Sequence, residues 1–407
     1  MSWPLFFLLL GTMLGFLCLA GAMRTAWKRH LIDCLPTSKT TGVFIGFVEV
    51  NGSAESNFPL CSHLAGIPCV YFSWSVEEHW KRTVTETYTD SKGKQCTRTR
   101  EEDGWTCVAG GGCEQPFYLR DDCGEILIRP DGAAVDPVSV FYKTCDRDNP
   151  LYFEKGPPDS VPDSDHSRRF GESAIPLHAA LCIFGQARER KDIVAAEIAA
   201  DASAPMFLIS TRTKEQISRG YSGTVGILWV LGLLLGVSGF VARDLLLDID
   251  PTQRWPFYVL PATGYALAAV IGWFWMIFNS LVDLRQRVLR AGSLVDIELR
   301  RRHDLIPNLV GAVTGMRDHE FHLQPRLATL RARQDWTVNP APLAVAEAYP
   351  VLKSHQGFLH LHQSLTETED RIALARSYLN EITMHYNTRL QTIPEGFSAR
   401  LFGMRSL

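Results

Sequence analysis

The sequence predicts a multi-domain membrane protein with three transmembrane helices, a β-rich α+β soluble domain and a C-terminal all-α antiparallel helical bundle. Three uncharged apolar stretches, 3–22, 224–242 and 257–279, each have about the 20 residues that a helix needs to cross a bilayer. Short β-branched and aromatic runs between glycines occur throughout 24–223. Apolar residues in 280–407 recur with alternating gaps of three and four, the spacing of packed helices.

Lys and Arg residues near the ends of the apolar stretches predict the orientation, because cytoplasmic flanks carry an excess of positive charge. No basic residue precedes the first stretch and several follow it; several precede the second stretch, and several follow the third. We therefore expect a multi-pass protein of the cell membrane with its N-terminus outside and with 24–223 and 280–407 in the cytoplasm. The flanking residues include Arg24, Lys28, Arg29, Arg212, Lys214 and Arg219.

A cleaved signal peptide is the alternative for the first stretch, since Ala20-Gly21-Ala22 has the small residues of a cleavage site. Signal peptides carry their positive residues before the apolar run, whereas here they follow it. The order of charge favours a retained transmembrane helix.

Composition and cysteine spacing exclude several classes of protein. The net charge of −3 and the absence of a long basic stretch argue against nucleic acid as a partner. Nine of the ten cysteines lie in the part expected in the reducing cytoplasm, and none forms a C-x-x-C pair, so we expect no metal site and no cofactor. Two alternatives stay open: a metal held by Cys96, Cys107, Cys113 and Cys123, and disulfides if the orientation is inverted.

The predicted strands of the first soluble part occupy 42–52, 68–76, 117–119, 124–128, 181–185 and 205–209. Two short threonine-rich strands within 88–107 are expected to form a hairpin around Asp90-Ser91-Lys92-Gly93. Asp121-Asp122 indicates a tight turn. The Pro-, Asp- and Ser-rich segment 155–168 is predicted to be an exposed loop.

Several of these segments resemble the membrane-flanked GIDE domain, named for the mitochondrial E3 ubiquitin ligases that carry it. The matching residues are Gly42-Val43 through Gly52, Leu60-Cys61-Ser62, Gly66 through Tyr71, Asp122-Cys123-Gly124, Ile183 through Ala187 and Phe207 through Ser210. The resemblance covers about 24–242 and implies a membrane-adjacent fold. In the ligases a RING finger follows the second membrane span; because no cysteine follows Ala242 here, ligase activity is not carried over.

The C-terminal third contains narrow apolar seams on its predicted helices. One seam follows Leu281, Leu284, Val288, Ala291 and Val295; the last helix repeats the pattern from Leu361 to Tyr386. This spacing is typical of antiparallel bundle or coiled-coil packing. Pro307 predicts a kink or a break near Asp304–Pro307, because proline removes a backbone hydrogen bond.

These residues also resemble the LemA family. The matching motifs are Asn279 through Val282, Val295 through Val310, His319-Glu320, Glu347 through Lys353, Thr366 through Arg376, Tyr386-Asn387, Ile393-Pro394 and Ala399 through Gly403. The resemblance implies a cytosolic helical bundle carried by a transmembrane helix, without an established catalytic activity. The stretch 334–342 is shorter and richer in proline than the connection usual in the family.

Candidate binding residues fall into two groups, and neither forms a catalytic constellation. Arg285, Arg287 and Arg290 follow the third apolar stretch closely and are candidate contacts of lipid headgroups. The LemA-like motif supplies further candidates. The triplet at 300–302 is expected to form ion pairs within the bundle or to a neighbour, and nucleotide or lipid binding is the alternative. These motif candidates are Arg301, Arg302, Asp304, Pro307, Asn308, Glu369, Arg376 and Asn387.

The sequence therefore supports two functions of different classes. The first is a non-enzymatic membrane-anchored scaffold or interaction protein, whose partners are the lipid bilayer and a protein, or a second copy, bound through the bundle. The second is a ligand- or redox-sensing module that uses the cysteine-rich β-domain. The scaffold is favoured, because no Ser/His/Asp or paired-carboxylate arrangement stands out.

Overall fold

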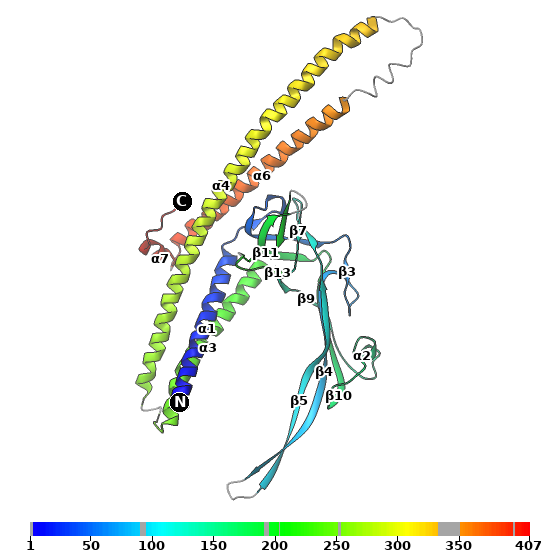
Figure 1. Cartoon of the computed structure of the whole chain (residues 1–407). Helices are drawn as coiled ribbons and strands as arrows, with labels where there is room; N and C mark the ends of the chain where they lie inside the picture. The colour runs from blue at the N-terminus through cyan, green and yellow to red at the C-terminus, as the bar shows by residue number, and fades with distance from the viewer. Residues whose placement is uncertain are drawn as a thin grey trace. The chain divides into compact units, whose positions relative to one another are not determined.

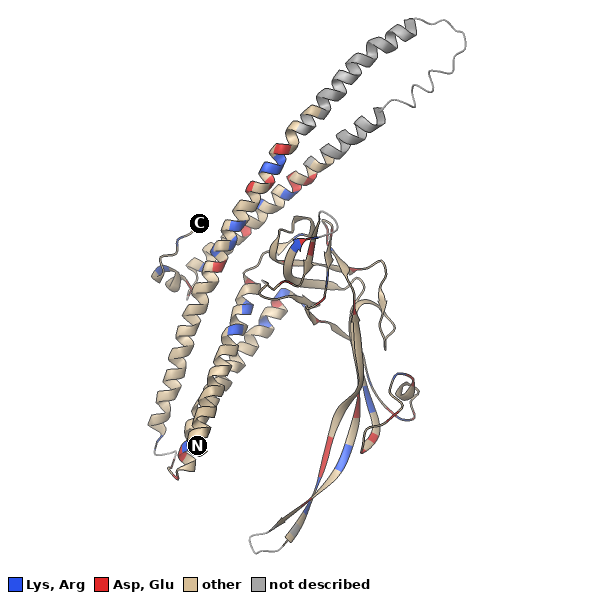
Figure 2. Ribbon diagram, in the orientation of Figure 1, with Lys and Arg blue, Asp and Glu red and all other residues tan. Residues whose placement is uncertain are grey.

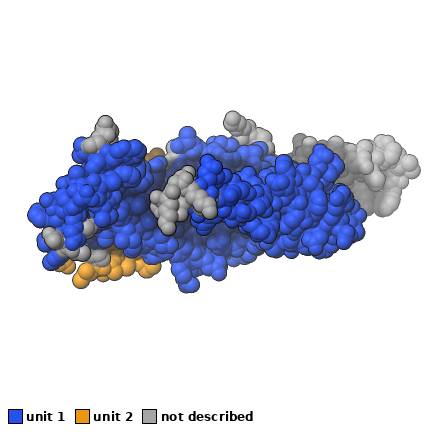
Figure 3. Space-filling view, turned by 90° about the horizontal axis from the view of Figure 1, so that it is seen from below, with its two compact units in different colours: residues 1–273 blue, residues 274–407 orange. Residues whose placement is uncertain are grey.

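The computed structural model forms two compact units, Met1–Trp273 and Phe274–Leu407 (Figure 3). The residues that it describes are 3–89, 95–190, 195–202, 204–250, 254–332, 351–393 and 395–407. Of these, 89, 96, 308–310, 312–332, 351–362 and 365 are described by their backbone alone.

Among the described residues, three helices are long and apolar enough to cross a membrane by length and composition: α1 (Trp3–Asp33), α3 (Lys214–Leu246) and the first part of α4 (Trp255–Ala332). This confirms the three predicted apolar helices. Figure 2 shows long stretches of these helices without a charged residue. α1 and α3 lie side by side (Figure 1).

Glycines bring the backbones of α1 and α3 into contact. A Cβ atom added at Gly11 would lie 2.7 Å from Cα of Gly239, and one added at Gly15 would lie 3.0 Å from the carbonyl oxygen of Gly232. Small residues that let two backbones approach are the usual means by which helices pack inside membranes, where lipid is as apolar as leucine.

Strands of the first unit close into a ring. β11 pairs with both β12 and β2, and β2 continues through β6 and β7 back to β12. The core inside is aliphatic and aromatic, with Val50, Phe117, Leu119 and Ile183 fully buried. The strands of this sheet are β1 (Thr37–Ser38), β2 (Gly46–Glu55), β6 (Phe117–Arg120), β7 (Glu125–Ile128), β8 (Ala134–Asp136), β11 (Ala180–Glu189), β12 (Ala196–Ala199) and β13 (Leu208–Ser210).

A second sheet has the order β3-β4-β10-β9, and β5 pairs with β4 along the edge opposite β10. The predicted hairpin is confirmed, because β4 and β5 pair on either side of 90–94, but its strands are not short: they have 22 and 20 residues. Cross-strand ion pairs of Lys81 with Glu101 and Arg82 with Glu102 stabilise a polar stretch that hydrophobic alternation does not reveal. The elements are η1 (Thr40–Gly42), β3 (Leu60–Cys61), β4 (Pro68–Thr89), β5 (Gln95–Glu114), β9 (Val138–Asp146), α2 (Leu151–Glu154) and β10 (Ser164–Pro176).

The prediction that 155–168 is an exposed loop was wrong for its last residues. β10 begins at Ser164, and Arg168 on this strand is fully buried. The physical reason is a long-range ion pair to Glu78 on β4, which composition alone does not show.

The second unit contains the rest of α4, together with α6 (Val351–Gln391) and α7 (Glu395–Leu401). Seam residues Leu281 and Leu284 on α4 and Ile382 and Tyr386 on α6 are buried. Of the kink or break predicted near Asp304–Pro307, the break was wrong, since α4 continues as helix through Pro307 to Ala332. An intact helix at proline requires the freed carbonyl group to be satisfied elsewhere, which solvent does on an exposed helix face.

Candidate functional site

The first cluster of polar residues joins the β-domain to the helices. Thr213 caps α3 by a capping box with Gln216, and this places Lys214 in the first turn. The Lys214 ammonium donates to Oε2 of the buried Glu49 at 2.7 Å and to the carbonyl oxygen of Leu35. Because Leu35 is the second residue after α1, this one side chain connects the end of α1 with α3 and strand β2.

An apolar cluster surrounds that connection. Ile32 of α1, Phe184 of β11 and Ile217 of α3 are buried against one another. Cys182 is part of the cluster, and burial raises the pKa of its thiol to about 12. A protonated buried thiol is inert, so this cysteine acts as a small apolar residue in the joint.

A second polar cluster lies between β4, α2 and β10. The Arg168 guanidinium donates to Oε2 of Glu78 at 3.0 and 3.2 Å, and both side chains are fully buried. Arg168 also donates to the carbonyl oxygens of Tyr152, Pro157 and Asp159 and lies 3.8 Å from the centre of the Tyr152 ring. Every arginine donor group is therefore used to hold the 150–163 segment against the sheet.

Other buried carboxylates are likewise engaged inside the fold. Glu172 accepts the backbone N–H groups of His63, Leu64 and Ala65 at 2.6–3.0 Å. Glu197 accepts from Arg129 and Arg188, each at 2.8 Å. Carboxylates held by several fixed donors stabilise the loops and strands that supply those donors.

Asp121, Asp122 and Cys123 are the group within the described part of the chain whose ligand atoms converge, lying within 4.8 Å of one another. Asp121 already accepts from the backbone and hydroxyl of Thr40 and from two amides of its own turn. Asp122 pairs with Lys39 at 2.5 Å. These contacts form the expected turn between β6 and β7, so both carboxylates already have partners within the fold.

The cysteines divide into buried and exposed thiols. Cys69, Cys145 and Cys182 are buried, and burial raises the pKa of each, to about 11 for Cys69. Raised pKa values oppose nucleophilic and redox chemistry, which require the thiolate. No disulfide joins the cysteines whose side chains the structure describes; the exposed ones are Cys61, Cys107, Cys113 and Cys123.

The LemA-like candidates lie on α4 and α6. Arg302 of α4 pairs with Glu369 of α6 at 2.5 Å, which fixes the register of the two helices. Glu298, one turn before Arg302, is largely buried, and its Oε2 has no hydrogen-bond partner among the described residues. Arg376 is exposed.

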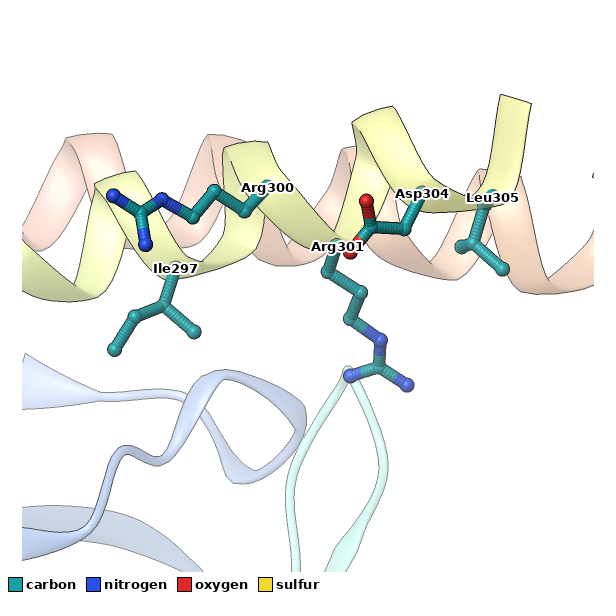
Figure 4. A pocket seen from close by; sticks show the side chains of 5 residues that line it. All are labelled: Ile297, Arg300, Arg301, Asp304 and Leu305. Carbon is teal, nitrogen blue, oxygen red and sulfur yellow. The ribbon is translucent and has the colours of Figure 1, made fainter. Parts of the chain in front are cut away.

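An open hollow of about 380 Å³ lies along one flank of α4 (Figure 4). Ile297, Arg300, Arg301, Asp304 and Leu305 line it, so that two arginines, one carboxylate and two aliphatic side chains share the surface. Arg301 and Asp304 are thus brought together, whereas Pro307 is exposed further along the helix and the side chain of Asn308 lies outside the described residues.

The candidate lipid contacts differ in availability. Arg285 and Arg290 are exposed, but the side chain of Arg287 is only 13% exposed and donates to Asp283 at 2.9 Å. Arg290 lies 3.9 Å from the same carboxylate. Asp283 therefore neutralises part of the positive charge at this place.

The end of α6 holds the C-terminal tail, a role that the motif pattern did not reveal. Asn387 donates to the carbonyl oxygen of Leu407 at 3.0 Å and accepts from its amide, and the Tyr386 hydroxyl donates to the carbonyl oxygen of Arg405. Arg389 donates to both oxygens of Glu395 and to the Ser280 hydroxyl. Together these bonds fix α7 and the tail beside Ser280 of α4, directly after the apolar stretch 257–279.

Comparisons with known proteins find the same two families as the motifs, although the GIDE match begins at 85 and leaves the motifs at 42–71 outside it. The LemA family model matches 291–342 and 341–407, and the GIDE family model, described as E3 ubiquitin ligase, matches 85–243. No curated protein and no solved structure matches the chain significantly. The chain therefore joins a GIDE segment to a C-terminal LemA segment, as its motifs predicted, and both families suggest a membrane-associated protein.

Proposed function

Because the chain joins a GIDE segment to a LemA segment, we propose that it is a non-enzymatic scaffold anchored in the cell membrane by α1, α3 and the first part of α4. Both soluble parts face the cytoplasm in this proposal, in agreement with the Lys and Arg residues that flank the apolar stretches. The helices α4 and α6 present a surface to a protein partner or to a second copy.

The observation that carries the proposal is the joint around Glu49 and Lys214. A buried ion pair inside an apolar cluster fastens the β-domain to two membrane helices at once. Such a joint suits a domain that is held at a fixed place beside the membrane. The buried charges Glu78, Arg168 and Glu172 have their partners inside the β-domain, where they hold loops and strands in place.

The sensor is the alternative function, and the exposed thiols are the observation in its favour. Cys61, Cys107, Cys113 and Cys123 are accessible to an oxidant or an electrophile. However, the pKa of Cys123 is raised, by partial burial and by the neighbouring Asp122 and Asp121, which disfavours its thiolate. A ligase role is disfavoured, because no cysteine follows Cys182 to build a RING finger.

Replacing the four exposed cysteines by serine tests the two functions against each other. The readout is the set of proteins cross-linked to the chain in native membranes by a lysine-reactive reagent, before and after mild oxidation. The scaffold predicts the same set for the wild type and the variant under both conditions. A set that changes on oxidation in the wild type and not in the variant would contradict it and support the sensor.

A further inference from the structure

The C-terminal segment of the second unit carries an exposed apolar surface. Ile393, Phe397 and Leu401 are 91%, 65% and 67% exposed, and Phe402 and Leu407 are about half-exposed. So many large apolar side chains in a segment of 15 residues form a patch that soluble proteins rarely leave uncovered. We call residues 393–407 the tail patch.

The helix within the tail patch is amphipathic. Gly396, Ser398 and Ala399 of α7 are buried against the rest of the unit. Phe397, Leu401 and, between them in the helical repeat, Arg400 are exposed, since positions i, i+3 and i+4 share a face. One face of α7 therefore packs inward while the other offers two apolar side chains and a positive charge.

Contacts within the second unit fix the place of the tail patch along α4. The Phe278 and Phe402 rings lie 4.6 Å apart, and Arg389, which holds Glu395 at the start of α7, donates to the Ser280 hydroxyl at 2.8 Å. Figure 1 shows α7 beside α4. Phe278 and Ser280 are the residues at which the third apolar stretch, 257–279, ends. The tail patch thus lies at the level where this stretch would leave the hydrocarbon.

The positive charge of the tail patch also fits a position at the membrane surface. Arg400 and Arg405 are exposed, and neither side chain forms an ion pair within the described part of the chain. In contrast, Arg287 and Arg290 share Asp283. Free arginines next to exposed apolar side chains are typical of segments that lie in the bilayer interface, with the apolar groups in the acyl boundary and the charges among anionic headgroups.

We propose that the tail patch binds the surface of the membrane in which the chain is anchored, inserting Phe397 and Leu401 at the headgroup–acyl boundary and directing Arg400 and Arg405 to lipid phosphates. This inference rests on the proposed membrane anchoring. The base of the α4–α6 pair is then fixed to the bilayer at two points, the apolar stretch of α4 and the tail patch. The bonds of Tyr386, Asn387 and Arg389 hold the patch at the required height.

The test uses the full chain in nanodiscs that contain anionic lipid, with nitroxide labels on single cysteines in a background without native cysteines. Labels replace Phe397 and Leu401 in the patch. A matched control replaces Ile297, an α4 residue that is 58% exposed and lies 18 residues beyond Asn279, about 27 Å along a helix. A membrane control replaces Leu267 within the third apolar stretch.

We expect the labels at Phe397→Cys and Leu401→Cys to collide with oxygen and to be shielded from a water-soluble nickel complex, as at Leu267→Cys, while Ile297→Cys shows the opposite. Patch labels that behave as at Ile297→Cys, with Leu267→Cys still in lipid, would overturn the inference alone. Labels shielded from both reagents would overturn it in favour of a protein cover. A water-exposed label at Leu267→Cys would instead overturn the anchoring itself.

A second measurement avoids the cysteine-free background. The wild-type chain is placed in nanodiscs with an anionic lipid whose headgroup is photoactivatable, and mass spectrometry locates the cross-linked residues. We expect cross-links within 393–407 and not within 295–305. Cross-links spread equally over both segments would contradict the inference.

Discussion

The buried pair of Arg168 and Glu78 gives the sharpest prediction about stability. Arg168→Met keeps most of the aliphatic volume and removes two bonds to Glu78 and three to backbone carbonyls. Because both side chains are fully buried, the change leaves an uncompensated carboxylate inside the sheet. Breaking a buried pair in this way costs about 3–5 kcal/mol.

Arg169→Met is the matched control. This neighbour pairs with Glu77, the two side chains are about a third exposed, and its guanidinium lies 4.4 Å from the centre of the Trp105 ring. A partly exposed pair with a cation–π contact contributes no more than about 2 kcal/mol in total. The two variants thus remove adjacent arginines from one strand with very different expected effects.

The assay is thermal unfolding of the purified chain in detergent, followed by tryptophan fluorescence, together with hydrogen exchange of 150–163. For a domain of about 200 residues each kcal/mol lowers Tm by about 2–4 °C, so Arg168→Met should lower Tm by about 6–20 °C and increase exchange in this segment. Adding Glu78→Gln to Arg168→Met should recover part of the loss, because a neutral amide costs less to bury than an unpaired carboxylate. Equal Tm values for the two single variants would refute the reasoning.

Three further predictions concern the packing of α1 on α3, the titration of two buried carboxylates and the bonds that hold the C-terminal residue. Gly11→Leu should separate α1 from α3 and lower Tm in detergent by the equivalent of about 1–3 kcal/mol, whereas Gly264→Leu, where an added Cβ meets nothing within 4 Å, should leave it unchanged. Burial raises the pKa values of Glu78 and Glu197, but hydrogen bonds from their partners outweigh it and hold both pKa values below 4.5. The stability that the two carboxylates contribute is therefore present above pH 4.5 and is lost as the pH falls through their lower folded-state pKa values. An unfolding midpoint that does not fall on acidification below about pH 4.5 would contradict this. Asn387→Ala removes both bonds to Leu407, costing about 1–3 kcal/mol locally, and should speed carboxypeptidase digestion of the tail relative to the wild type.

Sequence patterns predicted correctly those elements that depend on residues close together in the chain. The apolar helices, the seam from Leu281 to Val295 and the turn at Asp121 each depend on residues close in sequence, and they are present as expected. Periodicity did not reveal that Arg168 is buried, or that the hairpin strands are long and extend over Pro68–Thr89 and Gln95–Glu114. Both features depend on cross-strand pairs of polar residues.

The joint and the tail required three-dimensional information. Lys214 and Glu49 are 165 residues apart, and no spacing rule connects them. Asn387 was recognised as a motif residue, but its bond to Leu407 depends on the chain reversing after α6. The same holds for Pro307: its effect on α4 depends on which groups satisfy the freed carbonyl, and the helix continues through it.

The central claim is that an anchored chain carries both soluble parts on the cytoplasmic side. The most direct test is labelling with a membrane-impermeant maleimide in intact cells and in inverted vesicles, using the native exposed thiols of the β-domain and, in a variant without them, a cysteine at Ile297. The scaffold account predicts labelling of both parts in inverted vesicles alone and without prior reduction. Labelling in intact cells, thiols that react only after a reductant, or labelling of the two parts from opposite sides would contradict it.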